Sequence, residues 1–385
     1  MANTNHAHSL PEPQESKKLF TEQEVDELLD LEKHGIVVND SEEILLTEED
    51  LNIIKAQEKV RGKVNEKVVP PHVTDGIPDN EFKKKLHESK IIKGEILAYS
   101  GNEEGKAEGL MGDMPFYAVT ENGIYYANTP KERNDDGFLI DPKSKTLIVT
   151  DGIGSVKVGY VASNIALHRA AVDLDKTNLK SVPPYKLDTL VQNMNHSVDE
   201  YQDNNPSFKK TSATVVAARI NDDRSVDIAY AGDSKAIIIR GDKVVFTTIE
   251  DNALSYIMWK DKITEQEAQD KFGYEQYWKL KNGVLQCLGH EANYVSWETK
   301  ETSRDVNPHL QNIKTQKGDV LILCSDGLSD NLTDSEIAWS INKSLKNEKS
   351  LNEAIEHLKL EALHKMKNPD EGKGDNITIA GVQIQ

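Results

Sequence analysis

The feature that most constrains the fold is a series of short apolar runs, rich in Val, Ile and Thr. The runs at 213–220 and 226–233, followed at once by 235–240, are separated by short polar turns, which is typical of antiparallel hairpins. The strands thus come in adjacent pairs instead of alternating with helices, so the pattern favours an antiparallel α+β fold over a doubly wound parallel sheet. Further strands are predicted at 146–151, 319–326 and 376–384, and helices at 156–172, 184–203, 334–345 and 351–366.

Aspartates stand where many of these strands begin or end. The runs "LIVTDG", "IAYAGDS" and "LILCSDG" each end on an aspartate, and "GKGDNITIAG" and "ERNDDGFLI" have aspartates just before a strand. These residues are Asp151, Asp233, Asp326, Asp375 and the pair Asp135 and Asp136. A single aspartate at a strand end is most often a turn former or a helix cap. So many in one chain are harder to explain in that way, and in a shared sandwich these strand ends can converge at one rim.

Several carboxylates at one rim could not all stay ionised without cations between them. Sites built only from oxygen suit hard divalent ions such as Mg²⁺ and Mn²⁺ better than zinc or copper. The only cysteines, Cys287 and Cys324, do not have the spacing of a zinc site. Two ions that share a carboxylate lower the pKa of a bound water and hold phosphoryl oxygens. The residues therefore indicate metal-assisted phosphoester hydrolysis, with the substrate class still open.

Charge and composition argue against several other classes. The net charge of −19 disfavours binding to nucleic acid or to an anionic membrane, because phosphates would be repelled. No apolar run is long enough to predict a transmembrane helix, and the N-terminus lacks the apolar centre of a secretory signal. Two distant cysteines do not suggest a disulfide framework. We therefore expect a cytoplasmic protein without nucleic-acid or membrane partners.

The composition changes along the chain and predicts an N-terminal extension before one large domain. Residues 1–18 are polar and are expected to be a disordered tail. Residues 19–69 are expected to form an acidic helical extension, and 70–90 a linker rich in Pro and Gly. Residues 91–385 are then the main domain. Since two short helices cannot form a core alone, the extension is expected to dock on that domain or to act as an autoinhibitory or partner-binding arm.

Five motifs occur in a fixed order: "RNDDGFLIDPKSKTLIVTDGIGS", "TSATVVAARI", "AYAGDSKAIIIR", "LILCSDGLSDNLTDSEI" and "GDNITIAGVQI". This ordered set resembles the metal-dependent serine/threonine protein phosphatases (protein phosphatase type 2C, PPM). The stretch "FTTIEDNALSYIMWKDKITEQEA" resembles the bacterial branch in particular. The resemblance covers roughly residues 95–385. It implies a four-layer α-β-β-α sandwich of two antiparallel sheets flanked by helices, and hydrolysis of phosphoserine and phosphothreonine in phosphoprotein substrates.

The resemblance also implies a binuclear Mg²⁺ or Mn²⁺ centre. Asp151 matches the carboxylate that bridges both ions, and the carbonyl of Gly152 matches a ligand of the second ion. Asp326 and Asp375 match the remaining ligands of the first ion, so these two residues and Asp151 are the implied catalytic set. Asp136, with Asp135 beside it, matches acids that hold the water shell of the second ion. A hydroxide that bridges the ions would then attack phosphorus in line, without a phosphoenzyme.

A third ion is implied for the bacterial branch. Asp233 and Asp330 match the acids that hold this third, more weakly bound metal. The implied cofactors are therefore two or three Mg²⁺ or Mn²⁺ ions.

Two departures from the family pattern leave a second interpretation open. The family's phosphate-binding arginine is replaced by Lys131, which supplies charge without the bidentate fork. Arg133, two residues further on, is the other candidate for binding the substrate phosphate. After Gly152 the chain reads Ile153-Gly154-Ser155, where the family usually has a Gly-Gly pair around His or Met. The alternative is a degenerate phosphatase fold that acts as a binding or regulatory module, and a general hydrolase of small phosphoesters is a third possibility.

Overall fold

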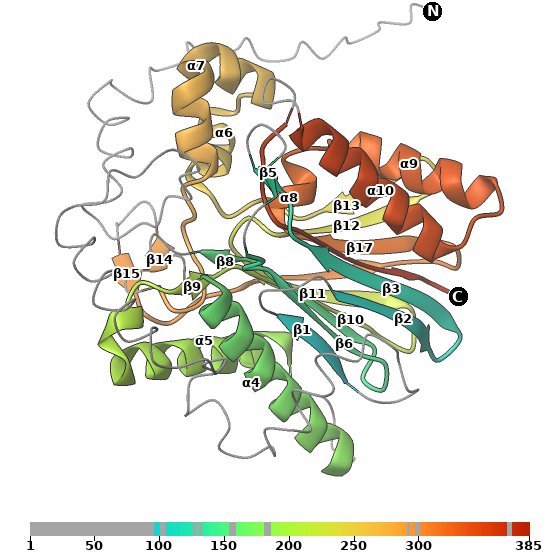
Figure 1. Ribbon diagram of the computed structural model, residues 1–385, viewed down its shortest axis with the longest axis horizontal. Helices are drawn as coiled ribbons and strands as arrows, with labels where there is room; N and C mark the ends of the chain where they lie inside the picture. Colours follow the sequence, from blue (N-terminus) through green and yellow to red (C-terminus); the bar gives the residue numbers. More distant parts are fainter. Residues whose placement is uncertain are drawn as a thin grey trace, which may run out of the picture.

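The computed structural model describes residues 96–100, 105–125, 129–130, 133–153, 159–180, 186–290, 293–296, 301–367 and 372–385. These residues form two six-stranded antiparallel sheets, one stacked on the other (Figure 1). The first sheet has the order β1 (Leu97–Ser100), β6 (Gly137–Asp141), β7 (Thr146–Thr150), β10 (Val215–Ile220), β11 (Ser225–Ala231), β16 (His309–Lys314). The second has the order β13 (Lys243–Thr247), β12 (Lys235–Arg240), β17 (Val320–Cys324), β18 (Ile377–Gln383), β3 (Met114–Glu121), β2 (Gly105–Met111).

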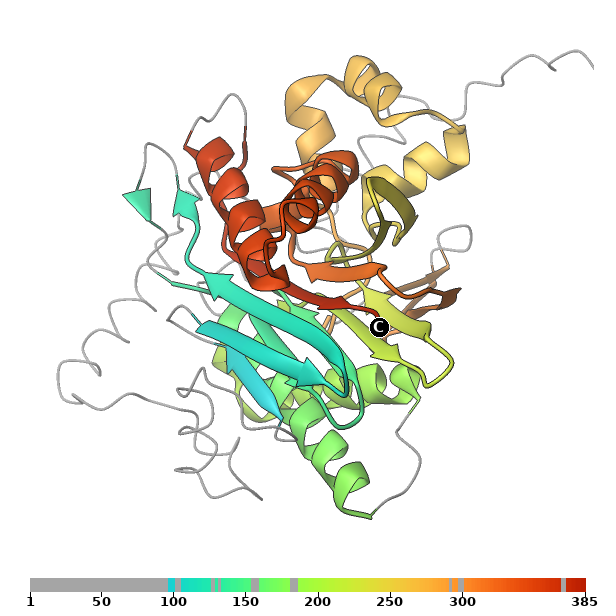
Figure 2. The same ribbon diagram turned by 90° about the vertical axis from the view of Figure 1, so that its right-hand side faces the viewer.

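Helices cover the outer face of each sheet, which makes four layers (Figure 2). Helices α4 (Gly159–Lys180) and α5 (Leu187–Asn204) pack on the first sheet, and α9 (Asp334–Lys346) and α10 (Leu351–Met366) on the second. A further pair, α6 (Ala253–Asp261) and α7 (Glu265–Lys281), stands at one end of the sandwich (Figure 1). The short elements are β4 (Ile124–Tyr125), β5 (Thr129–Pro130), β8 (Gly152–Ile153), β9 (Ser212–Ala213), β14 (Asn293–Ser296), β15 (Glu301–Ser303), η3 (Pro206–Phe208) and α8 (Asp326–Ser329).

The central strands are apolar on both faces because both faces are covered. In β7, Ile148 packs in the layer between the first sheet and its helices, whereas Leu147 and Val149 pack between the two sheets. The corresponding layer on the other side joins β12, β17 and β18 to α9 and α10. Runs without polar alternation, such as β17, are what two-sided burial requires. The sandwich therefore contains three apolar layers, and the aspartates singled out in the sequence lie beyond the ends of its strands.

The antiparallel four-layer sandwich predicted from the sequence is confirmed. The six predicted strands appear as β7, β10, β11, β12, β17 and β18, and the four predicted helices as α4, α5, α9 and α10. Prediction missed edge strands such as β2 and β16, since an edge strand exposes much of its length and has a polar composition. The predicted tail, helical extension and linker, residues 1–90, lie outside the described residues. None of the helices that the structure describes is long and apolar enough to cross a membrane.

Candidate metal centre

The aspartates singled out in the sequence meet at one end of the sandwich. Strands β6 and β7 are antiparallel neighbours, so Asp136, just before β6, lies beside Asp151, just after β7. By the same geometry Asp326, which follows β17, lies beside Asp375, which precedes β18. Asp233 follows β11 and joins the same group. All five side chains are buried, since these residues are only 1% to 7% exposed.

Burial and mutual repulsion raise the pKa of the Asp136, Asp151, Asp233 and Asp326 carboxyl groups. Burial raises the pKa of Asp136 to about 7, with Asp375 and Asp326 adding to the effect and a hydrogen bond from Ser325 opposing it. Burial and the neighbouring aspartates also hold the pKa of Asp151 and of Asp233 well above the usual range. Without a cation, several of these groups would therefore hold protons near neutral pH. The cluster is electrostatically suited to positive charge.

Two of the strand-end aspartates, Asp151 and Asp326, are followed by a glycine that close backbone contacts require. A Cβ on Gly152 would lie 2.3 Å from the carbonyl carbon of Gly159, at the start of α4. A Cβ on Gly327 would lie 1.8 Å from the carbonyl oxygen of Asn376, at the start of β18. These Asp-Gly pairs are therefore more than turn formers, because the glycines let neighbouring segments approach the acids.

Buried hydroxyl groups orient the carboxylates from behind. Ser325 Oγ donates a 2.7 Å hydrogen bond to Asp136 Oδ2 and accepts one of 3.0 Å from the backbone N–H of Thr378. Thr214 Oγ1 accepts a 3.2 Å hydrogen bond from the backbone N–H of Asp151 and lies 2.7 Å from Ser234 Oγ. These contacts join both sheets at the end of the sandwich where the aspartates meet, which we call the rim. The sequence analysis did not single out Ser325 or Thr214. The only signal for them in the sequence is that they lie beside residues of the motifs that match the family.

Two buried lysines, which sequence reasoning also missed, neutralise part of the cluster. Lys373 Nζ lies 2.8 Å from Asp326 Oδ2, 3.0 Å from Asp330 Oδ2 and 3.9 Å from Asp375 Oδ2. Lys281 Nζ, at the end of α7, lies 2.9 Å from Asp330 Oδ1. Burial would raise the pKa of Asp330, but the two ammonium groups outweigh it and lower that pKa well below the usual range. Asp330 is therefore ionised and paired, unlike Asp136, Asp151 and Asp233.

The residues at this end fit divalent cations by one direct test. Asp326 Oδ1 is buried and has no hydrogen-bond partner among the described residues, an arrangement that is costly unless a cation is its partner. The surrounding donors are carboxylate oxygens, the ligands that Mg²⁺ and Mn²⁺ prefer. Within the described part of the chain, no three His, Cys, Asp or Glu side chains are already arranged around one ion position. A bound ion would therefore have to draw the carboxylates together, and its positive charge would offset their mutual repulsion.

One of the two candidates for phosphate binding is visible beside the cluster. Arg133 donates from Nε to Asp135 Oδ1 at 2.8 Å and from Nη2 to Asp135 Oδ2 at 3.3 Å. Its guanidinium carbon lies 4.6 Å from the centre of the Tyr160 ring. Asn376 holds the same segment, because its side-chain oxygen accepts from the backbone N–H of Asp135 at 3.0 Å. Lys131 and Ser155, on which the alternative interpretation depends, lie outside the described residues.

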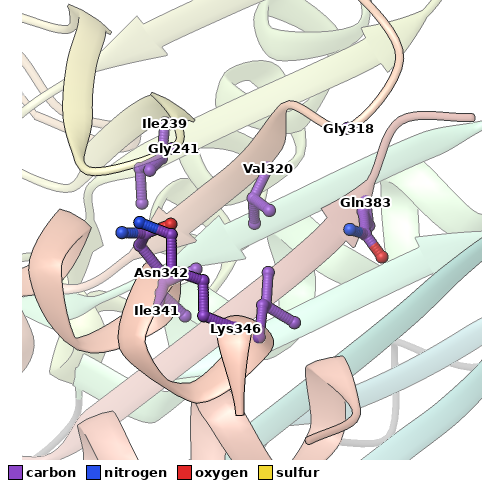
Figure 3. A pocket seen from close by; sticks show the side chains of 9 residues that line it. Ile239, Gly241, Gly318, Val320, Ile341, Asn342, Lys346 and Gln383 are labelled. Atoms are coloured by element: carbon purple, nitrogen blue, oxygen red, sulfur yellow. The ribbon is translucent and has the colours of Figure 1, made fainter. Parts of the chain in front are cut away.

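A pocket of about 210 Å³ lies between α9 and strands of the second sheet (Figure 3). It is bounded by the C-terminal part of α9, with Asn342 and Lys346, and by strand residues such as Val320 and Gln383. No acidic side chain lines it, so it does not belong to the candidate metal centre.

The chain is similar in sequence to known phosphatases. The sequence pattern of the protein phosphatase 2C family matches residues 128–365. The serine/threonine phosphatase Stp of Listeria innocua is 26% identical over 255 residues, which span 65% of this chain and 89% of that protein. The serine/threonine protein phosphatase PstP of Mycobacterium tuberculosis is 24% identical over 224 residues, which span 58% of this chain but only 38% of that protein.

Solved structures share the fold. The crystal structure of the Mycobacterium tuberculosis phosphatase PstP aligns with a TM-score of 0.52 and 23% identity over 71% of this chain and 99% of that one. The serine/threonine phosphatase of S. agalactiae aligns with a TM-score of 0.53 and 23% identity over 71% of this chain and 100% of that one. The catalytic domain of PstP in complex with two manganese ions aligns with a TM-score of 0.52 and 22% identity over 71% of this chain and 99% of that one.

Proposed function

Because the chain belongs to the protein phosphatase 2C family of serine/threonine phosphatases, we propose that it hydrolyses phosphoserine and phosphothreonine in proteins with two Mg²⁺ or Mn²⁺ ions held at the carboxylate end of the sandwich. The observation that carries the proposal is the buried group of Asp136, Asp151, Asp326 and Asp375, in which Asp326 Oδ1 lacks a partner in the described structure. That PstP's catalytic domain binds two manganese ions supports the choice of metal.

Each residue at this end has a proposed task. Asp151, at the tip of β7, would bridge the two ions, with the carbonyl of Gly152 on the second. Asp326 and Asp375 would complete the ligands of the first ion, and Asp136 would hold water on the second. When bound, the ions would supply an activated water for attack on phosphorus and positive charge for the phosphoryl oxygens.

The surrounding residues keep this arrangement in place. Ser325 orients the carboxylate of Asp136 through the 2.7 Å hydrogen bond. Thr214 anchors the backbone of Asp151. Arg133, held by Asp135, would bind the substrate phosphate, with Lys131 as the other candidate. The pre-set orientation of these groups is what gives a metal site its activity.

The proposed partner is a phosphoprotein, and the proposed compartment is the cytoplasm. Both cysteines are buried and unpaired, which agrees with a reducing environment. The metal centre itself does not distinguish a phosphoprotein from a small phosphoester, because the substrate surface is a property of the surrounding loops.

The direct test is to assay phosphate release from phosphoserine, phosphothreonine and phosphotyrosine peptides in parallel, with Mn²⁺ and with EDTA. We predict release from the serine and threonine peptides with Mn²⁺, little from the tyrosine peptide, and none in EDTA. Asp326→Asn should lower kcat by about 100-fold or more, because charge stabilisation at the reacting group is a large term. Asp222→Asn, at a fully exposed side chain far from the rim in the fold, is the control and should leave kcat unchanged. Absence of metal-dependent turnover in the folded wild type would favour the binding-module interpretation.

A further inference from the structure

Two ammonium groups are buried among the aspartates of the rim. The side chains of Lys373 and Lys281 are only 10% and 11% exposed. Each ammonium group pairs closely with a carboxylate: Lys373 Nζ lies 2.8 Å from Asp326 Oδ2, and Lys281 Nζ lies 2.9 Å from Asp330 Oδ1. Both lysines therefore carry fixed positive charge inside the site.

The lysines use both carboxylate oxygens of one aspartate. Lys281 Nζ pairs with Asp330 Oδ1 at 2.9 Å, and Lys373 Nζ pairs with Asp330 Oδ2 at 3.0 Å. An ion bound by Asp330 would have to displace one of these ammonium groups. The displaced ammonium group would then lie where its charge is less well compensated. Asp330 is therefore poorly placed to serve as a metal ligand.

Lys373 also divides the two oxygens of Asp326. It pairs with Asp326 Oδ2 at 2.8 Å, while Oδ1 of the same carboxylate is buried without a hydrogen-bond partner in the described structure. The lysine thus covers the side of Asp326 that faces Asp330 and leaves the other oxygen for an ion. An ion can bind Asp326 Oδ1 while Lys373 stays in place. An ion between Asp326 and Asp330 would need the position that the Lys373 ammonium group already occupies.

Both lysines are held in position by contacts beyond the carboxylates. Asn331 Oδ1 accepts a 2.9 Å hydrogen bond from the backbone N–H of Lys373, and Asn331 Nδ2 donates a 2.9 Å bond to the Lys373 carbonyl. Lys373 Nζ also lies 3.2 Å from Asn282 Oδ1, next to the end of α7. Lys281 Nζ lies 5.4 Å from the centre of the Trp278 ring. The α6–α7 pair is thereby tied to the metal end through charge.

We propose that Lys373 and Lys281 take the place of the third metal ion in this chain. Asp330 then neutralises the two lysines, and the protein binds two ions instead of three. Lys281 also couples α7 to the rim. This inference rests on the proposed function, since it assumes that two ions bind at Asp136, Asp151, Asp326 and Asp375. Asp233, which lies within electrostatic reach of Lys373, is then not an ion ligand.

The test is the number of Mn²⁺ ions bound per chain at saturation, measured by equilibrium dialysis and elemental analysis. We expect two ions for the wild type, two for Asp330→Asn and three for the double variant Lys281→Met/Lys373→Met, in which Asp330 is freed. Lys365→Met, which removes a lysine paired with Glu336 on the outer helices, is the matched control and should bind two.

Other results would overturn the proposal. Three ions in the wild type, falling to two in Asp330→Asn, would make Asp330 a metal ligand and overturn this inference while leaving the proposed function intact. A folded double variant that still binds two ions would show that the lysines do not fill an ion position. A wild type that binds no Mn²⁺ would overturn both the inference and the proposed function.

A stability measurement covers the case in which the double variant folds poorly. In EDTA, Lys373→Met alone should melt about 5–10 °C below the wild type, because it leaves buried carboxylates without their cation. Saturating Mn²⁺ should recover most of this loss, because an ion can replace the ammonium group. Lys365→Met should lower the melting temperature by much less, and equally with and without Mn²⁺. An equal loss for Lys373→Met in EDTA and in Mn²⁺ would mean that the lysine is only structural, and the proposal would be wrong.

Discussion

At the scale of single residues, Arg133 offers a sharp test of phosphate binding. Its Nε and Nη2 are engaged by Asp135, so Nη1 is the guanidinium nitrogen that this pair does not use. We predict that Arg133→Ala lowers kcat/KM for a phosphopeptide by about 10- to 100-fold, mainly through KM, since a hydrogen bond to a charged group contributes about 1.5–3 kcal/mol. Steady-state kinetics with Mn²⁺ measure this.

Three further variants show whether Arg133 or Lys131 binds the phosphate. Arg169→Ala, which removes an arginine paired with Asp173 on α4, should leave KM unchanged. If Arg133→Ala is also unchanged while Lys131→Ala raises KM strongly, the phosphate contact belongs to Lys131. In that case Lys131→Arg should increase activity, because arginine restores the bidentate fork.

The aspartates of the rim could be predicted one by one from the sequence, whereas the lysines that pair with them could not. Asp151, Asp326 and Asp375 each stand at the end of an apolar run, so their position follows from strand prediction. Lys281 lies near none of them in sequence and reaches Asp330 only because α7 ends beside the rim. Lys373 stands two residues before Asp375, but a lysine in a loop is usually a solvated charge, so its burial could not be inferred.

At the scale of elements, antiparallel pairing explains why the site forms. The end of β7 meets the start of β6, and the end of β17 meets the start of β18. The hairpin-like spacing of apolar runs predicted antiparallel pairing, and the acids were expected to converge if the strands shared the sandwich that the family resemblance implied. Helices α6 and α7 were not predicted. Their apolar residues, such as Leu254 and Ile257, pack mainly within the pair and give no long periodic stripe.

The N-terminal ninety residues are predicted to be dispensable for folding and for chemistry. The protein phosphatase 2C pattern matches residues 128–365, and the elements between Leu97 and Gln383 form both sheets and the helices that cover them. A chain of residues 91–385 should therefore fold and hydrolyse an aryl phosphate with Mn²⁺ at least as fast as the full chain. A rate increase would assign an autoinhibitory role to residues 19–69, and equal rate constants would exclude one. Loss of folding or of Mn²⁺-dependent activity in the shorter chain would contradict the prediction.

At the scale of the whole molecule, the rim should make stability depend on pH in a particular direction. Asp136 has a pKa of about 7 in the folded protein, raised mainly by burial, against about 3.9 in an unfolded chain. A carboxyl group with a raised pKa costs stability when it ionises, so the metal-free protein should lose stability as pH rises from about 4 to about 7. Urea unfolding in EDTA at several pH values measures this.

The matched variant is Asp136→Asn, in which the loss of stability with rising pH should be smaller. With saturating Mn²⁺ the wild type should no longer lose stability over this range, because ion binding requires ionised carboxylates. A free energy of unfolding in EDTA that increases from about pH 4 to about pH 7 would show that the acids are not held in a repelling, buried group.

The central claim is that two divalent ions bind among the aspartates at one end of this sandwich, with lysines at the third position. Anomalous diffraction from crystals grown with Mn²⁺ tests it most directly. We predict two manganese peaks among Asp136, Asp151, Asp326 and Asp375, with Lys281 and Lys373 still paired with Asp330. No manganese at this end would contradict the metal centre, and a third peak on Asp330 would contradict the role given to the lysines.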